Sequence, residues 1–185
     1  MDICEVFSIK KDTIVDSLRA SMDQEEVRDL LELLADFKPK VVLEIGVHRG
    51  YSMELWRKAF NPPVIIGIDN DLHAVDKKAT EGMIIIDGDS HTSKVRDYVE
   101  VVLTGLPVDL LFIDGDHHYD SVKKDWELYT PLVKKGGVVI LHDVSVEDNS
   151  SVDVSKFWQN LDHSKFDRSV LIHNKNGTGI GVIFL

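Results

Sequence analysis

From residue 41 onward the hydrophobic positions follow two alternating patterns. Short apolar runs alternate with longer stretches in which apolar residues recur at helical spacing. The runs are Val41–Ile45, Val64–Ile68, Met83–Ile86, Val108–Ile113 and Val138–Leu141. Their only charges are Glu44 and Asp109, and near-continuous apolar runs are typical of parallel strands that are covered on both faces. We therefore expect these runs to form a buried parallel sheet.

The amphipathic stretches predict the helices that cover this sheet. They are Tyr51–Phe60, Leu72–Ala79, Thr92–Leu103, Tyr119–Val133 and Val154–Leu161. Repeated strand–helix–strand units predict a doubly wound, Rossmann-like α/β fold with three α-β-α layers.

The C-terminal region departs from this alternation. Two strand candidates, Ser169–His173 and Ile180–Leu185, are separated only by Asn174–Gly179, which contains an Asn176–Gly177 pair. So short a link cannot make a parallel crossover, and it favours an antiparallel hairpin. The expected sheet has seven strands and is mostly parallel, with one antiparallel C-terminal strand.

Residues 1–40 predict an N-terminal helical segment that packs on the core of a single domain. One apolar stripe at spacing i, i+3, i+4, i+7 comprises Val27, Leu30, Leu31 and Leu34. Ser21 and Gln24 fit a capping box, and Pro39 should end the helix near Lys38. A shorter helix is expected over Asp12–Ala20.

Composition narrows the classes of function. The 185 residues hold 21 basic and 32 acidic side chains, so the net charge of −11 repels phosphate backbones and argues against nucleic-acid partners. The single cysteine, Cys4, excludes a disulfide framework. No run approaches the roughly 18–20 apolar residues of a membrane span, and the N-terminus does not fit a signal peptide. We expect a cytoplasmic protein without a membrane partner.

Polar residues gather just after the predicted strands, where ligands bind in open α/β sheets. Gly46 and Gly50 follow the first strand, Asp69 follows the second, and Asp89 and Ser90 follow the third. Each feature alone also fits an ordinary turn or helix cap. Together, they predict a site for a nucleoside cofactor, with Asp69 accepting hydrogen bonds from a ribose.

The first turn also indicates which cofactor is bound. A dinucleotide fingerprint has a glycine where this chain has His48, whose side chain would crowd a pyrophosphate. Glu44 would repel two phosphates and suits a cationic ammonium and sulfonium. The pattern favours S-adenosyl-L-methionine and leaves an NAD-dependent oxidoreductase as a weaker alternative.

Two stretches resemble a known family. Val42–Ser52 resembles motif I of class I S-adenosylmethionine-dependent methyltransferases, and Leu111–Tyr119 is similar to their small branch of sugar and antibiotic-tailoring O-methyltransferases. That branch includes proteins described as cephalosporin hydroxylase or rhamnosyl methyltransferase, and the resemblance runs from about Leu30 to the C-terminus. It implies a methyltransferase domain over residues 41–185. The cofactor-binding residues expected from the pattern and the resemblance are Glu44, Gly46, Gly50, Ser52, Asp69, Asn70, Asp89, Ser90 and Asp114.

The fourth and fifth predicted strands end in residues suited to the reaction. Asp114, His142 and Asp143 could share one divalent cation, as acidic strand-end residues do in metal-assisted O-methyltransferases. His142 departs from that pattern because Mg²⁺ prefers oxygen ligands. Three alternatives stay open: Asp114 and Asp143 bind Mg²⁺ while His142 turns away, the metal is Mn²⁺ or Zn²⁺, or no metal binds. The resemblance places the general base, with Asp114 beside it, at His117; spacing alone does not separate His117 from His118.

The sequence therefore predicts O-methylation of a hydroxyl on a sugar or other small molecule. The remaining length has no room for a substrate domain, which favours a small-molecule or glycan-end acceptor. The loop Val144–Val152 could cover it. The alternatives are a non-catalytic nucleoside-binding protein and, more weakly, an iron hydroxylase. Assembly into a homo-oligomer stays open.

Overall fold

The computed structural model describes residues 11–17, 22–146, 152–173 and 177–185. Cys4, the Ser21 half of the expected capping box, most of the expected loop over Val144–Val152 and the first half of the hairpin link lie outside the described residues.

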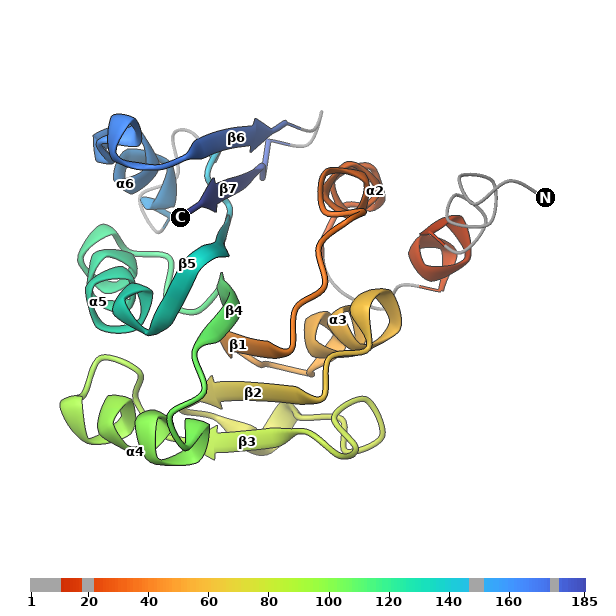
Figure 1. Ribbon diagram of the computed structural model, residues 1–185, viewed down its shortest axis with the longest axis vertical. Coiled ribbons are helices and arrows are strands. Elements are labelled where there is room, and N and C mark those ends of the chain that lie inside the picture. The colour runs from red at the N-terminus through yellow and green to blue at the C-terminus, as the bar shows by residue number, and fades with distance from the viewer. Residues whose placement is uncertain (1–10, 18–21, 147–151, 174–176) are drawn as a thin grey trace.

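Seven strands form one sheet in the order β3-β2-β1-β4-β5-β7-β6 (Figure 1). They are β1 (Val41–Ile45), β2 (Val64–Asp69), β3 (Ile84–Asp87), β4 (Val108–Ile113), β5 (Val133–His142), β6 (Arg168–Ile172) and β7 (Ile180–Phe184). Strands β1 to β5 pair in parallel, whereas β7 pairs antiparallel with both β5 and β6. The predicted fold class and hairpin are confirmed. The reversed strand lies between β5 and β6 rather than at the edge of the sheet.

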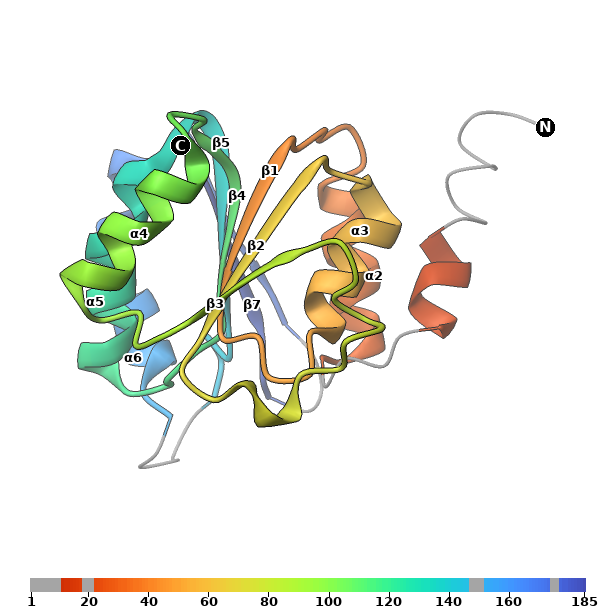
Figure 2. The same cartoon turned by 90° about the horizontal axis from the view of Figure 1, so that it is seen from below.

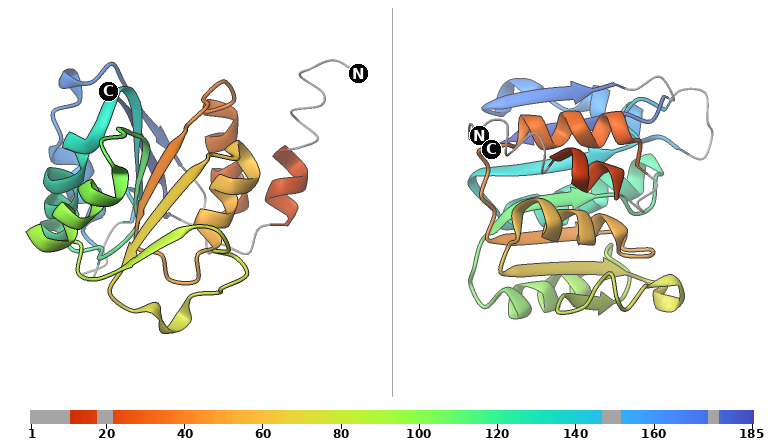
Figure 3. Two further views of the ribbon diagram at one scale, coloured as in Figure 1. Left: turned by 60° about the horizontal axis from the view of Figure 1, so that its bottom comes forward. Right: turned by 90° about the vertical axis from the view of Figure 1, so that its right-hand side faces the viewer.

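Helices cover both faces of the sheet, as Figure 2 shows in profile. On one face lie α2 (Gln24–Leu33) and α3 (Tyr51–Phe60), with a further helix over residues 11–16 outside them. On the other lie α4 (Ser93–Leu103), α5 (Tyr119–Tyr129) and α6 (Val154–Asn160). Short 3₁₀ turns span Leu72–Ala74, Thr130–Leu132 and His163–Lys165. Each face has its own apolar cluster, so the arrangement is the expected three-layer sandwich (Figure 3). None of the helices in the described part of the chain has the length and apolar character needed to cross a membrane.

The helix predicted over Leu72–Ala79 is wrong. Only Leu72–Ala74 is helical, as a 3₁₀ turn, and the backbone is extended at Val75. The Asp71 side chain accepts a hydrogen bond from His73 N, and Asp76 accepts from the backbone of Lys78 and Ala79. Aspartate side chains that bond the backbone in this way compete with a continuous helix.

Helix α2 confirms the predicted apolar stripe but not its ends. Val27, Leu30, Leu31 and Leu34 are all buried. The N-cap is Asp23, whose side chain accepts from Glu25 N at 2.8 Å, and the helix ends at Leu33 rather than near Lys38. Helix α5 likewise ends at Tyr129 rather than at Val133, because Pro131 cannot continue an α-helix and lies in the 3₁₀ turn over Thr130–Leu132.

Asp109 places a buried carboxylate inside β4 that fastens the start of β1. It is 4% exposed, and its Oδ2 accepts hydrogen bonds from Lys40 N and Val41 N, each at 2.8 Å, while Lys134 pairs with Oδ1.

We expect Asp109→Ala to lower the free energy of unfolding by about 2–4 kcal/mol, because it leaves two N–H groups without an acceptor. Urea denaturation measures this. Asp109→Asn keeps an acceptor oxygen and should lose less; equal losses in the two variants would contradict this reasoning.

Candidate functional site

A cavity of about 720 Å³ lies at the carboxyl ends of β1 to β5, where the strand order reverses between β1 and β4. Its size suits a small ligand. Turns from separate strands bring together most of the residues predicted from the sequence. The predicted site residues that line the cavity are Gly46, Ser52, Asp69, Asn70, Asp89, Ser90, Asp114, His117, His142 and Asp143.

Glu44 does not reach the cavity, contrary to the expectation that its charge faces the cofactor. The side chain is fully buried against α3, where it accepts hydrogen bonds from Ser52 Oγ at 2.5 Å and Trp56 Nε1 at 2.8 Å. Burial raises the pKa of Glu44 to about 8. The carboxyl is therefore mostly protonated at neutral pH, and it supports the cavity wall through Ser52.

Gly50 is likewise outside the cavity lining, because it serves the turn itself. It is the N-cap of α3 with φ 77°, a conformation that favours glycine. A Cβ atom at this position would lie 2.2 Å from Thr80 Cγ2. Gly50 therefore has a packing role, and the contact that the sequence predicted between Gly50 and the cofactor stays a prediction.

The buried state of Glu44 predicts how stability depends on pH. Its folded pKa of about 8 lies above the ordinary glutamate value of 4.5, so the folded protein holds a proton that the unfolded chain releases between these two pH values. This group should reduce wild-type stability as pH rises from about 4.5 to 8. We expect Glu44→Gln, which cannot ionise, to remove roughly 3–5 kcal/mol of this loss. Urea denaturation at a series of pH values measures it, with Glu81→Gln as an exposed control. Parallel curves for Glu44→Gln and the wild type would contradict the expectation.

Gly46 lies where the backbones of the β1 and β4 turns approach each other most closely. Its φ is 89°, and its N–H donates to Ile68 O at 2.9 Å. A Cβ atom at Gly46 would lie 2.0 Å from Asp114 O. Only glycine therefore fits, and the turn keeps the β4 end against the cavity.

Asp69 closes the first turn as well as lining the cavity. Its Oδ2 accepts from Val47 N at 2.8 Å and His48 N at 2.7 Å, and Oδ1 accepts from Asp71 N at 2.8 Å. A carboxylate has about four acceptor positions, so roughly one is left for a ligand. Asp69 therefore keeps about one acceptor position for the hydrogen bonds that the sequence predicted it to accept from a ribose.

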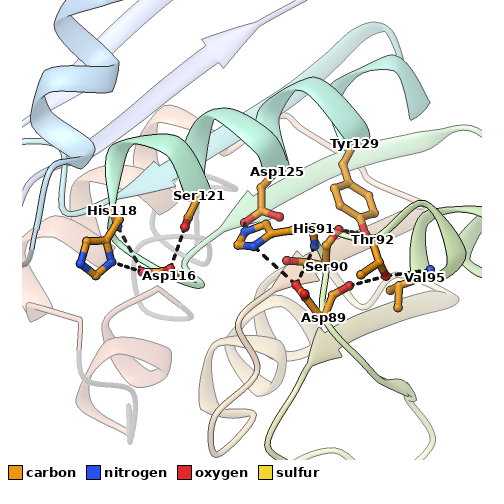
Figure 4. A network of polar contacts seen from close by, with 10 residues as sticks. All are labelled: Asp89, Ser90, His91, Thr92, Val95, Asp116, His118, Ser121, Asp125 and Tyr129. Carbon is orange, nitrogen blue, oxygen red and sulfur yellow. Dashed lines mark hydrogen bonds and ion pairs between the residues drawn. The ribbon is translucent and has the colours of Figure 1, made fainter.

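The third turn is held from behind by α5 (Figure 4). Tyr129 Oη donates to Ser90 O at 2.8 Å. His91 lies between two carboxylates, with Nδ1 3.4 Å from Asp89 Oδ1 and Nε2 3.5 Å from Asp125 Oδ2. Asp125 is fully buried, and this burial raises its pKa to about 6. These contacts fix the loop that holds Asp89 and Ser90, two of the predicted cofactor-binding residues.

At the ends of β4 and β5, the side chains of Asp114, His117 and Asp143 form a cluster. His117 Nε2 lies 3.3 Å from Asp114 Oδ1 and 3.1 Å from Asp143 Oδ2. The hydrogen bond to Asp114 raises the pKa of His117. Burial raises the pKa of Asp114, but hydrogen bonds from His117 and His142 outweigh it, so the pKa is below its usual value. Asp143 holds φ 58°, a strained conformation that turns its side chain toward the cluster.

His118, the other histidine that the sequence left open, lies away from this cluster. Its side chain is 61% exposed, and Nδ1 contacts Asp116 Oδ1 at 2.6 Å (Figure 4). His118 does not line the cavity, whereas His117 does.

His142 makes a different contact from the one that the metal prediction implies. Nδ1 lies 3.2 Å from Asp114 Oδ1 and 3.5 Å from Asp143 Oδ1. Burial lowers the pKa of His142, but these two carboxylates outweigh it and raise the pKa to about 10. Its ring is therefore the ion-pair partner of both carboxylates.

The residues brought together as a candidate metal group are Asp114, His117 and Asp143, whose ligand atoms lie within 4.8 Å of one another. The histidine of this group is His117, whereas the sequence predicted His142 as the third metal ligand. Two carboxylates and one imidazole suit Mn²⁺ or Zn²⁺ better than Mg²⁺. The donor set thus fits a divalent transition metal.

Sequence reasoning missed several residues around this end of the molecule, including Met22, Thr178 and Glu26. Met22 and Thr178 line the cavity, and Glu26 is fully buried on α2. Glu26 could have been suspected, because it lies four residues before Leu30 and hence beside the apolar stripe. Nothing local marks Met22 or Thr178, which reach the cavity only through tertiary packing.

Comparison with known proteins gives one family and several structural neighbours. A family model described as "Methyltransferase domain" matches residues 43–144. An uncharacterised protein of Acanthamoeba polyphaga mimivirus is 35% identical over 126 residues, which cover 62% of this chain and 57% of that protein. A second relative, from Sinorhizobium fredii, is 39% identical over 54 residues, covering 29% of this chain and 6% of that protein. The chain thus spans little more than half the length of the first relative.

The solved structures share the fold. MycE methyltransferase from the mycinamycin biosynthetic pathway, in complex with Mg, S-adenosylhomocysteine and mycinamycin VI, superposes with a TM-score of 0.68 at 18% identity. The match covers 96% of this chain and 54% of that one. An O-methyltransferase from Bacillus cereus in complex with S-adenosylhomocysteine gives a TM-score of 0.63 at 15% identity, covering 98% and 89% of the two chains.

Proposed function

We propose a methyl transfer as the function of this chain, which belongs to the methyltransferase domain family. The methyl group passes from S-adenosylmethionine to a hydroxyl of a sugar or other small molecule. One observation carries the proposal: the turns after β1, β2, β3 and β4 line a single cavity that also contains the Asp114–His117–Asp143 cluster. A donor site and a group able to take up a proton therefore adjoin.

The donor end of the cavity suits the three parts of the cofactor. The Gly46 turn offers backbone without a side chain, Asp69 retains about one acceptor position for the ribose, and the Asp89–Ser90 turn provides polar atoms for adenine. Bound S-adenosylmethionine supplies an electrophilic methyl group on a cationic sulfur, and the sulfur keeps the electron pair when the methyl group leaves.

His117 is the proposed general base. The acceptor oxygen loses its proton as it forms the new bond to carbon, and the neutral imidazole of His117 takes up that proton. Asp114 and Asp143 both lie beside Nε2 of the ring and stabilise the imidazolium that results. Proximity of these groups to the donor cavity favours direct transfer.

Asp114, His117 and Asp143 would hold a divalent metal, which when bound lowers the pKa of an acceptor hydroxyl. A neutral imidazole has one lone pair, so a His117 ring that binds a metal cannot also take up a proton, and the two roles exclude one another. Titration with Mn²⁺, followed by electron paramagnetic resonance in the wild type and His117→Ala, separates them. Loss of Mn²⁺ binding in the variant would assign His117 as a ligand and defeat the base assignment.

A second cavity adjoins the first and is the proposed acceptor site. Thr178 lines both cavities, and the second is also lined by Trp158 and Gln159 of α6 and by His173. An aromatic face with amide and imidazole groups suits a sugar, whose hydroxyls need hydrogen-bond partners. The MycE structure, a complex with S-adenosylhomocysteine and mycinamycin VI, supports an acceptor of this class.

Titration calorimetry with S-adenosylhomocysteine tests the proposal at its root. We expect saturable binding at one site per chain and no binding of NADH. Failure of S-adenosylhomocysteine to bind would end the methyltransferase reading. Transfer of labelled methyl groups to a panel of sugars and small polyols then tests catalysis. Binding without transfer to any acceptor would favour the non-catalytic alternative.

A further inference from the structure

Glu26 is a buried carboxylate on α2 whose hydrogen bonds are only half satisfied. Oε1 accepts from Thr178 Oγ1 at 2.9 Å and from Gly179 N at 2.5 Å. Oε2 is buried and has no hydrogen-bond partner among the described residues. A buried carboxylate oxygen is costly unless a donor faces it, so this arrangement calls for a partner.

The group that faces Glu26 Oε2 is the His142 ring. Its Nε2 lies 4.0 Å away and is itself buried without a hydrogen-bond partner in the described part of the chain. On the opposite side of the ring, Nδ1 contacts Asp114 and Asp143. The ring therefore lies between Glu26 of α2 and the carboxylates of Asp114 and Asp143.

We propose that Glu26 is a positioning residue for His142: it holds the Nε2–H, so that Nδ1–H points at Asp114 and Asp143. The two ring nitrogens are rigidly opposed, so fixing the direction of one fixes the other. Asp114 and Asp143 are the carboxylates that orient His117. Glu26 thereby connects α2 to the base through His142. This consequence for the reaction rests on the proposed function, whereas the contact itself does not.

Ring proton exchange in the full chain, labelled with ¹⁵N-histidine, tests the contact. We expect the wild type to show a proton on His142 Nε2 that exchanges with water far more slowly than those of exposed His118; loss of the signal in His142→Gln assigns it. Glu26→Gln should speed this exchange about tenfold, because its one acceptor oxygen is taken by Gly179 N–H. Glu25→Gln is the matched control, since it removes the same charge from an exposed position one residue earlier.

Two results would overturn the proposal: a His142 Nε2 without a proton in the wild type, or the same exchange rate in Glu26→Gln and the wild type. If Glu26→Gln fails to fold, Glu26→Asp replaces it, and its carboxylate, one methylene shorter, should also release the proton faster. The wild-type spectrum decides even without either variant.

Cofactor binding and turnover separate this proposal from the proposed function. Glu26 does not line the cavity, so Glu26→Gln should bind S-adenosylhomocysteine as the wild type does. With an acceptor from the panel, kcat should fall about 10-fold or more while the KM for S-adenosylmethionine is unchanged. An equal rise in KM would point to a merely structural role and count against positioning. Absence of S-adenosylhomocysteine binding to the wild type defeats the proposed function but leaves the Glu26–His142 contact standing.

Discussion

Replacing His117 with alanine is expected to lower the turnover of methyl transfer by about 10²–10⁴-fold and to leave the affinity for S-adenosylhomocysteine nearly unchanged. The variant loses the group that accepts the acceptor proton, while the turns after β1 to β3 keep their contacts. Single-turnover rates with labelled S-adenosylmethionine give the first quantity, and titration calorimetry gives the second. An equal loss of both would remove the base assignment.

The pH profile and a neighbouring variant provide controls. His118→Ala removes an exposed imidazole next in sequence and should leave turnover nearly unaffected. The base acts in its neutral form, and the hydrogen bond to Asp114 raises the pKa of His117 above 6.5. The wild-type rate should therefore rise with pH and reach its midpoint above pH 6.5. A midpoint below that value would contradict the geometry.

Gly46→Ala is expected to abolish S-adenosylhomocysteine binding and to lower the free energy of unfolding by several kcal/mol. The added Cβ would lie 2.0 Å from Asp114 O, and φ 89° is itself unfavourable for alanine. Because the neighbour is backbone, relief requires the β1 and β4 turns to separate, which opens the donor cavity. Urea denaturation and titration calorimetry measure the two effects.

Gly105→Ala separates the two causes. Gly105 has a similar φ of 83°, but a Cβ atom there would meet nothing within 4 Å. The free energy of unfolding of Gly105→Ala should therefore fall by about 1–2 kcal/mol, which is the cost of backbone strain alone. If Gly46→Ala were no more destabilised than Gly105→Ala, the close approach to Asp114 would not constrain the turn.

Much of the fold is predictable because its signals are local. The apolar runs at Val41–Ile45 and Val108–Ile113 coincide with strands, and the short link before Ile180 correctly predicts the hairpin. The segment after Asp71 shows the limit, since its apolar spacing resembles a helix but aspartate side chains divide it into turns. Helical spacing cannot reveal that competition.

The candidate site was predictable as a set of strand ends but not as a set of side-chain directions. Sequence reasoning placed Asp69, Asp114 and His117 at one edge, where the structure also has them. It gave Glu44 the wrong surroundings, because the direction of a side chain inside a buried strand depends on α3 packing against it. Glu26 is more than a hundred residues from its partners at the start of β7, so only tertiary structure brings them together.

The interior position of β7 bears on how the chain is made. Among the strands of the described residues, β6 pairs only with β7, although β7 is synthesised after it. During translation, β1 to β5 can assemble while β6 still lacks its pairing strand. Strands β6 and β7 can join the sheet only once residues 180–184 have left the ribosome. A nonsense codon shortly before residue 180 would therefore cost the sheet two strands and leave β5 as an open edge on which nascent chains could aggregate.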